Sequence, residues 1–320
     1  MTSKVFINGK ICNAENASVS VLDRGYLFSD GVYELIPYFN KKPFLFDKHY
    51  LRLEKSLKSI ALKNPYEKKI WVKKINSFVK ECEYKNFSLY IQVTRGVPNN
   101  IDDGILREHA TTKEYKFTIC MFCSEIKELS NNYYMGTRWN ENQPEDHERY
   151  ASNDLTGMVR EDLALEFPAM QNAITAEDKR WLQCDIKSIA LLFNAYTKSI
   201  AYKKGAYEAI LSRDNVVTEG CSSNVFIIKD KIIKTPPKSN LILPGITRDF
   251  IINDILQRKQ YEILETKFSK KELLAADEVF ITNSTQGVLS IVKIDNQIVN
   301  NEECGEITTQ IYRNFIDYIR

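Results

Sequence analysis

A polar stretch about two fifths of the way along the chain separates two groups of strand-like and helix-like segments. The stretch is Ser124–Asn132, in a chain of 320 residues. A single hydrophobic core rarely grows beyond roughly 250–300 residues, so this length favours two cores. We predict a smaller domain over 1–123, a linker over 124–130 and a larger domain over 131–320.

The larger domain begins with a segment, 131–167, that is dense in Asn, Glu and Asp. It contains a helix-like run at Asp154–Glu166. A linker, an insertion and a lid all fit a long segment of this composition. We treat it as an insertion in the larger domain.

Charge and hydropathy exclude several classes of protein. Lys and Arg number 44 and Asp and Glu 42, which gives a net charge of +2, and no basic block is long enough to follow a polyanion. No apolar stretch approaches the roughly 18 residues that span a bilayer, and the first residues lack the apolar region of a signal peptide. We therefore expect a cytoplasmic protein with neither nucleic acid nor membrane as a partner.

The cysteines and histidines give no sign of a metal or a disulfide framework. Seven cysteines are scattered along the chain, an odd number that favours reduced thiols. Cys120 and Cys123 form a CxxC in a strand-like run, where residues three apart point to opposite faces. No His, Asp and Glu cluster has the spacing of metal ligands, so we expect no metal site.

Apolar periodicity predicts the elements of the smaller domain. We expect a hairpin around Asn8-Gly9, helices at Asp47–Leu62 and Glu67–Cys82, and strands at Ser88–Thr94 and Tyr115–Phe122.

The larger domain has a mixed pattern of strands and helices. We expect a helix at Ser188–Lys204 that ends at Gly205, strands at Tyr207–Leu211, Val216–Thr218, Asn224–Ile228, Lys231–Lys234 and Glu278–Thr282, and a helix at Arg248–Arg258. The two domains together predict an α+β protein.

Two short loops have the residues of anion-binding sites. Gly245–Thr247 lies where the chain turns into a helix, so its backbone N–H groups would favour an anion. Asn283–Thr285 follows a strand and is rich in hydroxyl donors. Because no Walker or dinucleotide glycine pattern is present, we interpret the pair as holding one phosphate group. A plain helix cap is the alternative for each loop.

Lys187 and Glu219 are the candidate reactive groups. Apolar residues flank Lys187 at a strand-to-helix junction, where burial would favour the neutral, nucleophilic amine. A surface lysine at a helix start is the alternative. Glu219 lies in Val217–Asn224 among small hydroxyl residues, and its alternative is a turn residue.

Several short motifs occur in order along nearly the whole chain, apart from about 131–167. They are Leu22–Glu34 (LDRGYLFSDGVYE), His49–Ser56 (HYLRLEKS), Gln92–Gly96 (QVTRG), Asp185–Ser188 (DIKS), Gly205–Leu211 (GAYEAIL), Val217–Phe226 (VTEGCSSNVF) and Ile242–Arg248 (ILPGITR). Together they resemble the motifs of the class IV, fold type IV pyridoxal-phosphate (PLP) aminotransferases. Within the family, the chain is most similar to the D-amino-acid aminotransferases. The resemblance implies a smaller α/β domain, a larger β-barrel-like domain with helices, an active site between them, and a homodimer.

The same resemblance implies roles for individual residues. Lys187 matches the lysine that bonds to PLP and moves the proton between the substrate Cα and the cofactor C4′ carbon. Glu219 matches the carboxylate that keeps the pyridine nitrogen protonated. The implied phosphate holders are Arg52, Ile246, Thr247, Asn283 and Ser284, the residues near the ring are Leu243, Ser222 and Ser223, and the substrate residues are Tyr33, Ser284 and Thr285.

The chain departs from the subfamily pattern at the substrate carboxylate. D-amino-acid aminotransferases follow Thr-Arg-Gly with Pro-Arg-x-His, whose Arg and His reach from a second subunit. Here Asn100 and Asp102 stand at those places, and an Asp would repel a carboxylate. Arg138, Arg149 and Arg160 of the insertion are candidates to replace the missing cation if that segment folds over the site entrance. A surface insertion without a role in the site is the alternative.

We therefore expect a ping-pong transaminase that moves an amino group from a D-amino acid, such as D-alanine or D-glutamate, to 2-oxoglutarate or pyruvate. Three rivals share the fold. An aminodeoxychorismate lyase would release pyruvate and 4-aminobenzoate without an acceptor, a branched-chain L-amino-acid aminotransferase would differ at Gln92–Gly96, and a non-catalytic PLP-binding protein would not need both Lys187 and Glu219.

Overall fold

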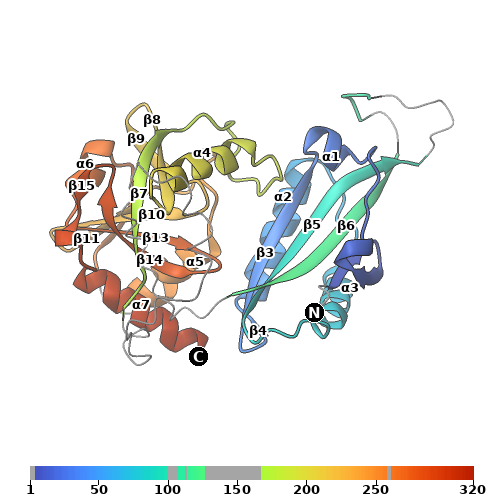
Figure 1. The fold of residues 1–320 in the computed structure, drawn as a ribbon, viewed down its shortest axis with the longest axis horizontal. Helices are drawn as coiled ribbons and strands as arrows, with labels where there is room; N and C mark the ends of the chain where they lie inside the picture. The colour runs from blue at the N-terminus through green and yellow to red at the C-terminus, as the bar shows by residue number, and fades with distance from the viewer. Residues whose placement is uncertain (1–3, 100–106, 112–113, 127–166, 258–260) are drawn as a thin grey trace, which may run out of the picture. The chain divides into compact units, whose positions relative to one another are not determined.

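The computed structural model describes residues 4–99, 107–111, 114–126, 167–257 and 261–320 (Figure 1). Its contacts divide the chain into two units, which we call the first and the second. The first contains residues 1–127, 182–192 and 320, and the second contains 128–181 and 193–319. The segment 182–192, with Lys187, thus groups with the first unit, although the sequence pattern assigned it to the larger domain. The predicted insertion lies outside the described residues, apart from its last residue.

The first unit is built on a six-stranded antiparallel sheet with the order β2-β1-β6-β5-β3-β4. Its strands are β1 (Lys4–Ile7), β2 (Lys10–Asn13), β3 (Gly31–Phe39), β4 (Lys42–Pro43), β5 (Phe87–Pro98) and β6 (Tyr115–Glu125). The predicted first hairpin is confirmed: Asn8 and Gly9 have φ of 49° and 94°, the left-handed conformation that a two-residue turn needs.

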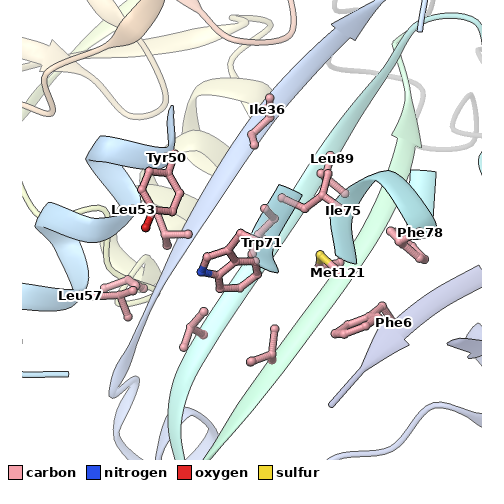
Figure 2. Close-up of a cluster of buried hydrophobic side chains, with 14 of the residues drawn as sticks. Phe6, Ile36, Tyr50, Leu53, Leu57, Trp71, Ile75, Phe78, Leu89 and Met121 are labelled. Carbon is pink, nitrogen blue, oxygen red and sulfur yellow. The ribbon is translucent and has the colours of Figure 1, made fainter. Parts of the chain in front are cut away.

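Two helices of the first unit, α2 (Phe46–Ser59) and α3 (Lys68–Val79), supply apolar residues to its core. Two shorter helices, η1 (Ala14–Asn16) and α1 (Arg24–Phe28), add no apolar residue to that cluster. Figure 2 shows Leu53 and Leu57 of α2 and Trp71 of α3 gathered with sheet residues such as Met121. Both predicted helices are confirmed, each a few residues shorter than its apolar pattern.

The second unit contains a nine-stranded mixed sheet with the order β12-β11-β10-β13-β14-β7-β8-β9, and β15 pairs with β14. Its strands are β7 (Met170–Glu177), β8 (Glu208–Arg213), β9 (Val216–Gly220), β10 (Asn224–Lys229), β11 (Ile232–Thr235), β12 (Ile263–Glu265), β13 (Glu278–Asn283), β14 (Gly287–Ile294) and β15 (Gln297–Ile298). Together, helices and sheets in both units confirm the α+β class.

After the segment 182–192, the helical elements are α4 (Leu192–Lys203), α5 (Ile246–Phe250), the π-helical η4 (Ile251–Leu256), α6 (Lys270–Leu274), η6 (Asn300–Glu302) and α7 (Glu306–Ile319). Helix α7, red in Figure 1, packs on β13 and β14. Helix α4 ends as predicted at Gly205, with φ of 70°.

Helix α4 begins later than predicted, because the residues before it pair with the first unit's sheet. Ser188 forms an antiparallel bridge with Val32, and the Ile189 N–H donates to the Gly31 carbonyl over 3.1 Å. A Cβ on Gly31 would lie 3.1 Å from Ile189 Cδ1 and 2.8 Å from the Val93 carbonyl oxygen. The glycine thus permits the close approach that holds this segment.

Each of the seven cysteines, all of them within the described residues, is a reduced thiol, as predicted. Burial raises the pKa of Cys120 to about 11, so its thiol is neutral at physiological pH. No helix within the described ranges is long and apolar enough to cross a membrane.

Candidate functional site

Lys187 is held by the first unit at both its backbone and its side chain. Its N–H donates to Ser56 Oγ over 3.2 Å, and its carbonyl accepts the Tyr33 N–H over 2.9 Å. Its Nζ lies 4.2 Å from the centroid of the Tyr33 ring, and that ring stacks on Tyr90 with centroids 5.4 Å apart. The candidate nucleophile and the candidate substrate residue Tyr33 are therefore in contact.

A buried network of Glu34, His49 and Arg52 lies in the same unit. Arg52 donates from Nε to Glu34 Oε2 over 3.0 Å and from Nη2 to Glu34 Oε1 over 2.6 Å. His49 Nδ1 lies 2.9 Å from Glu34 Oε1. Glu34 points to the same buried face of β3 as Val32, Ile36 and Tyr38, because side chains two residues apart in a strand share a face. This explains how a carboxylate reaches the core.

Electrostatics fix the charges of this network. Burial by itself raises the pKa of Glu34, yet Arg52 and His49 hold it well below its usual range. Burial lowers the pKa of His49 against the pull of Glu34, and the charge of Lys187 lowers it further. A neutral His49 that donates from Nδ1 has its Nε2 as an acceptor. This buried Nε2 has no hydrogen-bond partner among the described residues.

Arg107 and His109 are two functional candidates that the sequence analysis did not single out. Arg107 Nη1 lies 3.4 Å from His109 Nε2. Arg24 donates to the carbonyls of Glu108 and His109 over 2.7 and 2.9 Å, and so holds their backbone in place. Asn100 and Asp102 lie outside the described residues. The signal that could have found the pair is the Arg-x-His spacing, which recurs here at 107–109.

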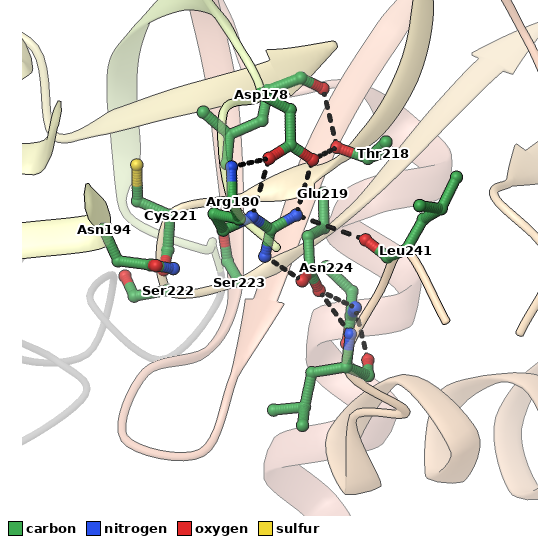
Figure 3. Close-up of polar contacts among 12 residues, drawn as sticks. Asp178, Arg180, Asn194, Thr218, Glu219, Cys221, Ser222, Ser223, Asn224 and Leu241 are labelled. Atoms are coloured by element: carbon green, nitrogen blue, oxygen red, sulfur yellow. Dashed lines mark hydrogen bonds and ion pairs between the residues drawn. The ribbon is translucent and has the colours of Figure 1, made fainter. Parts of the chain in front are cut away.

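Glu219 is a buried carboxylate on β9 of the second unit (Figure 3). Its Oε1 accepts from Arg180 Nη1 over 2.5 Å. Its Oε2 accepts from Asn224 Nδ2 over 3.1 Å and from the Leu243 N–H over 2.9 Å. A carboxylate offers about four acceptor positions, two on each oxygen. Among the described residues, Oε1 accepts from Arg180 alone, so one of its two positions can take a further donor.

Arg180 is shared between Glu219 and a second carboxylate, Asp178. Arg180 donates from Nε to Asp178 Oδ1 and from Nη2 to Asp178 Oδ2, each over 2.9 Å. Burial raises the pKa of Glu219 to about 7 against the lowering by Arg180, and Asp178 adds to the rise. The charge of Glu219 thus depends on how the network divides one cation between two acids.

The loop before α5 comes close to Glu219 because of Asn224 and Gly245. Asn224 Nδ2 also donates to the Leu243 carbonyl over 2.9 Å. A Cβ on Gly245 would lie only 2.0 Å from Asn224 Oδ1. Glycine is therefore required at this position for Asn224 to join Leu243 to Glu219.

The two predicted anion loops meet in the second unit. Thr247 Oγ1 donates to the Asn283 carbonyl over 3.2 Å. Asn283 Oδ1 in turn accepts from the N–H groups of Thr285 and Gln286 over 3.0 and 2.8 Å. Ile246 and Thr247 are buried, and Ser284 is half-buried. Residues 36 positions apart in sequence thus form one local arrangement.

Ser222 and Ser223 both donate to Glu208, a buried acid that the sequence analysis did not identify. Their Oγ atoms lie 3.0 and 2.9 Å from Glu208 Oε2. Lys198 Nζ lies 3.1 Å from Glu208 Oε1 and balances its charge. Because both hydroxyl protons are used toward Glu208, the hydroxyl oxygens act as acceptors, and Ser222 Oγ accepts from Lys198 Nζ over 3.3 Å.

Sequence reasoning missed the groups that partner the predicted residues: Glu34, Asp178, Arg180, Glu208 and Asn224. A signal existed for Glu34, since a period of two places it on the apolar face of its strand. The partner acids and arginine of Glu219 come from other parts of the chain, and no local pattern pairs them.

Comparisons with known proteins agree with one another on the family to which the chain is similar. The family described as Amino-transferase class IV matches residues 31–294. A D-alanine aminotransferase of Staphylococcus epidermidis is 36% identical over 323 residues, which cover 99% of this chain and 98% of the relative.

Two solved structures are similar to this chain in fold. A branched-chain aminotransferase from Thermoproteus uzoniensis has a TM-score of 0.78 at 21% identity, over 100% of this chain and 95% of that one. The branched-chain amino acid aminotransferase from Escherichia coli has a TM-score of 0.76 at 19% identity, over 98% and 93% of the two chains. At these identities the solved structures show the fold alone.

Proposed function

This chain belongs to the class IV aminotransferases, and we propose from that premise that it moves an amino group from a D-amino acid, such as D-alanine, to a 2-oxo acid with PLP as cofactor. The activity of a transaminase follows from the family. The choice of a D-amino acid is supported by the relative that is 36% identical over almost the full chain. The solved branched-chain enzymes support no L-substrate, because their likeness is one of fold.

The residues of the second unit fit the ring of the cofactor. When bound, PLP supplies an aldehyde that takes up the amino group and a protonated ring that withdraws electrons during proton transfer. We propose that Glu219 accepts a hydrogen bond from the ring nitrogen at Oε1, which has one acceptor position left by its donors in the described part of the chain. This open position on a buried carboxylate is the observation that carries the cofactor assignment. Leu243, Ser222 and Ser223 are proposed to lie beside the ring.

We propose that Lys187 holds the cofactor covalently and then carries the proton at its Nζ. Its backbone is fixed through Ser56 and Tyr33, so only the side chain has to move. The Tyr33 ring, with its centroid 4.2 Å from Nζ, blocks movement of the side chain toward that ring. Tyr33 is also proposed to contact the substrate together with Ser284 and Thr285.

The phosphate of the cofactor is proposed to bind Ile246, Thr247, Asn283 and Ser284, with Arg52 as the cation. The contact of Thr247 with Asn283 supports the role of the loops. Glu34 accepts two hydrogen bonds from Arg52 and thus directs its guanidinium. A buried arginine directed in this way binds an oxyanion with little loss of side-chain entropy.

We further propose that Arg107 and His109 bind the substrate carboxylate in place of Asn100 and Asp102. The two nitrogens approach within 3.4 Å, and Arg24 anchors their backbone. Arg107→Gln is expected to raise KM for D-alanine at least tenfold with a smaller change in kcat, as for a contact that binds ground and transition states alike. Lys116→Gln, on the exposed face of β6, is the matched control. An unchanged KM in Arg107→Gln would refute this assignment.

The protein is proposed to act as a homodimer. Tyr196 and Tyr202 of α4 are 66% and 64% exposed, and large exposed aromatic side chains are frequent at interfaces between copies. Light scattering coupled to size-exclusion chromatography should give twice the mass of 37.1 kDa. A mass of one chain at micromolar concentration would contradict the proposal.

Two measurements test the function itself. Borohydride reduction followed by peptide mass mapping should place a phosphopyridoxyl group on Lys187, and Lys187→Ala should remove it. A panel of D- and L-amino acids with 2-oxoglutarate or pyruvate should give parallel double-reciprocal lines with a D-amino acid. If instead aminodeoxychorismate yields 4-aminobenzoate without an acceptor, the lyase reaction is the function.

A further inference from the structure

One guanidinium, that of Arg180, joins two buried carboxylates. Figure 3 shows Arg180 between Asp178 and Glu219. Two donor atoms face Asp178, one faces Glu219, and Nη2 also donates to the Leu241 carbonyl over 3.2 Å. The side chains of Arg180, Asp178 and Glu219 are exposed by 8%, 0% and 6%, so water screens these charges little.

Asp178 is itself held on several sides. It accepts from Thr218 Oγ1 over 2.9 Å and from the Arg180 N–H over 3.1 Å. Arg213 Nη2 lies 3.2 Å from Asp178 Oδ1. In the described part of the chain, Arg213 joins the network through Asp178 and the Arg180 carbonyl rather than through Glu219. Asp178 therefore fixes the plane of the Arg180 guanidinium and directs Nη1 at Glu219 Oε1.

The two neighbours act on Glu219 in opposite directions. The positive charge of Arg180 favours the ionised carboxylate, whereas the negative charge of Asp178 disfavours it. Asn224 and the Leu243 N–H are neutral donors. The thiol of Cys221, which the charges of Arg180 and Asp178 also influence, is neutral because burial raises its pKa to about 12. The balance at Glu219 thus rests on one arginine and one aspartate.

We propose that Arg180 and Asp178 are positioning residues for Glu219: Asp178 clamps Arg180, Arg180 fixes Oε1, and the pair together sets how tightly Glu219 holds a proton. The proposal deepens the proposed function, because a carboxylate that accepts from the cofactor ring must be ionised yet basic. Arg180 supplies the first property and Asp178 the second. Neither residue is asked to touch substrate.

The test relies on the expectation that removing Arg180 and removing Asp178 shift the titration midpoint of Glu219 in opposite directions. In the full-length, cofactor-free protein, the infrared carbonyl band of protonated Glu219 is obtained by difference from Glu219→Gln and followed against pH. Arg180→Gln should move the midpoint up by at least one pH unit, a tenfold change in proton affinity. Asp178→Asn should move it down. Arg213→Gln is the matched control, since it removes an arginine that contacts Asp178 rather than Glu219, and its midpoint should stay within half a unit.

Arg180→Lys covers the case in which Arg180→Gln fails to fold. Lysine keeps the charge but cannot form the fork, so its midpoint should stay near that of the wild type while the affinity for PLP falls about tenfold. The proposal is overturned if the Arg180 and Asp178 variants move the midpoint in the same direction. It is equally overturned if Arg213→Gln moves it as far as Arg180→Gln.

A separate readout isolates the proposed function. The dissociation constant for PLP, measured by fluorescence quenching on the same proteins, should rise at least tenfold in Arg180→Gln and Glu219→Gln and little in Arg213→Gln. If the midpoints move as expected but the protein does not bind PLP, the proposed function is refuted and the role of Arg180 and Asp178 stands. If the protein binds PLP but the midpoints do not move, the role of Arg180 and Asp178 is refuted and the proposed function stands.

Discussion

Glu34 in the first unit and Glu219 in the second are both buried glutamates that contact a buried arginine, yet they differ in charge behaviour. Glu34 accepts two hydrogen bonds from Arg52 and one from His49, and its pKa is held well below the usual range. Glu219 accepts one hydrogen bond from Arg180, which also serves Asp178, and its pKa is raised to about 7. An arginine that pairs with one carboxylate keeps that carboxylate ionised. An arginine shared between two carboxylates leaves one of them able to titrate near neutral pH.

This difference matches the two proposed tasks. As a proposed phosphate holder, Arg52 needs a constant direction, and a permanently ionised Glu34 supplies it. A group that keeps a proton on a ring nitrogen needs a proton affinity close to that of the nitrogen, and Glu219 has the raised value. Burial is similar in the two cases, so the partners decide the outcome.

Removing the carboxylates should give the largest difference between the two networks. Glu34→Leu takes away the acid that both Arg52 and His49 contact, so we expect a loss of about 3–5 kcal/mol in the free energy of unfolding. Glu219→Leu should cost less, about 1–3 kcal/mol, because Arg180 keeps Asp178. Urea denaturation of both variants measures this. Equal losses would contradict the view that Arg52 serves one carboxylate while Arg180 is divided between two.

The pH dependence of stability should have opposite signs. Glu219 has a raised pKa in the folded protein, so its contribution is fully present below about pH 4.5 and is lost as the pH rises through about 7, up to about 3 kcal/mol. The contribution of Glu34 is present above its ordinary pKa of 4.5 and is lost as the pH falls further. Urea midpoints of the cofactor-free protein and of Glu219→Gln, compared at pH 5 and pH 8, test the first sign. Between pH 5 and pH 8, the difference in urea midpoint between the wild type and Glu219→Gln should change more than the difference between the wild type and Glu34→Gln.

Removing a neutral donor from either network should cost less stability than removing Glu34, and about as much as removing Glu219. His49→Phe removes the hydrogen bond to Glu34, and Asn224→Leu removes the one to Glu219. We expect each to cost about 1–3 kcal/mol, the range for leaving a buried acceptor with one partner fewer. The midpoint of Glu219 should move up in Asn224→Leu and stay unchanged in His49→Phe. A shift in His49→Phe would show that the networks are coupled.

The smallest effect is expected at Ser56. Its hydroxyl accepts the Lys187 N–H, so Ser56→Ala should cost about 0.5–1.5 kcal/mol. The rate of borohydride incorporation at Lys187 should change in parallel, because the backbone of the segment loses one support. Ser59→Ala, whose hydroxyl donates to the carbonyl of Lys55 on exposed surface, is the control and should leave that rate unchanged.

The local elements were readable because their causes are local. The Asn8-Gly9 turn, the apolar spacing in α2 and α3, and the stop at Gly205 each depend on neighbouring residues. The start of α4 was predicted four residues early, because Ser188 pairs with Val32, which is distant in sequence. The same limit applies to α2, where the apolar Leu51 is 60% exposed while the polar His49 and Arg52 occupy the buried face.

The candidate site divides in the same way. The residue types and their order singled out Lys187, Glu219 and the two loops, because reactive and anion-binding groups leave local patterns. Tertiary structure alone decided which charges from separate segments face one another: Glu34 with Arg52, and the near neighbours Asp178 and Arg180 with Glu219. The physical reason is that a pKa depends on burial and on charges within a few ångströms. Those distances are set by packing between segments that the sequence keeps far apart.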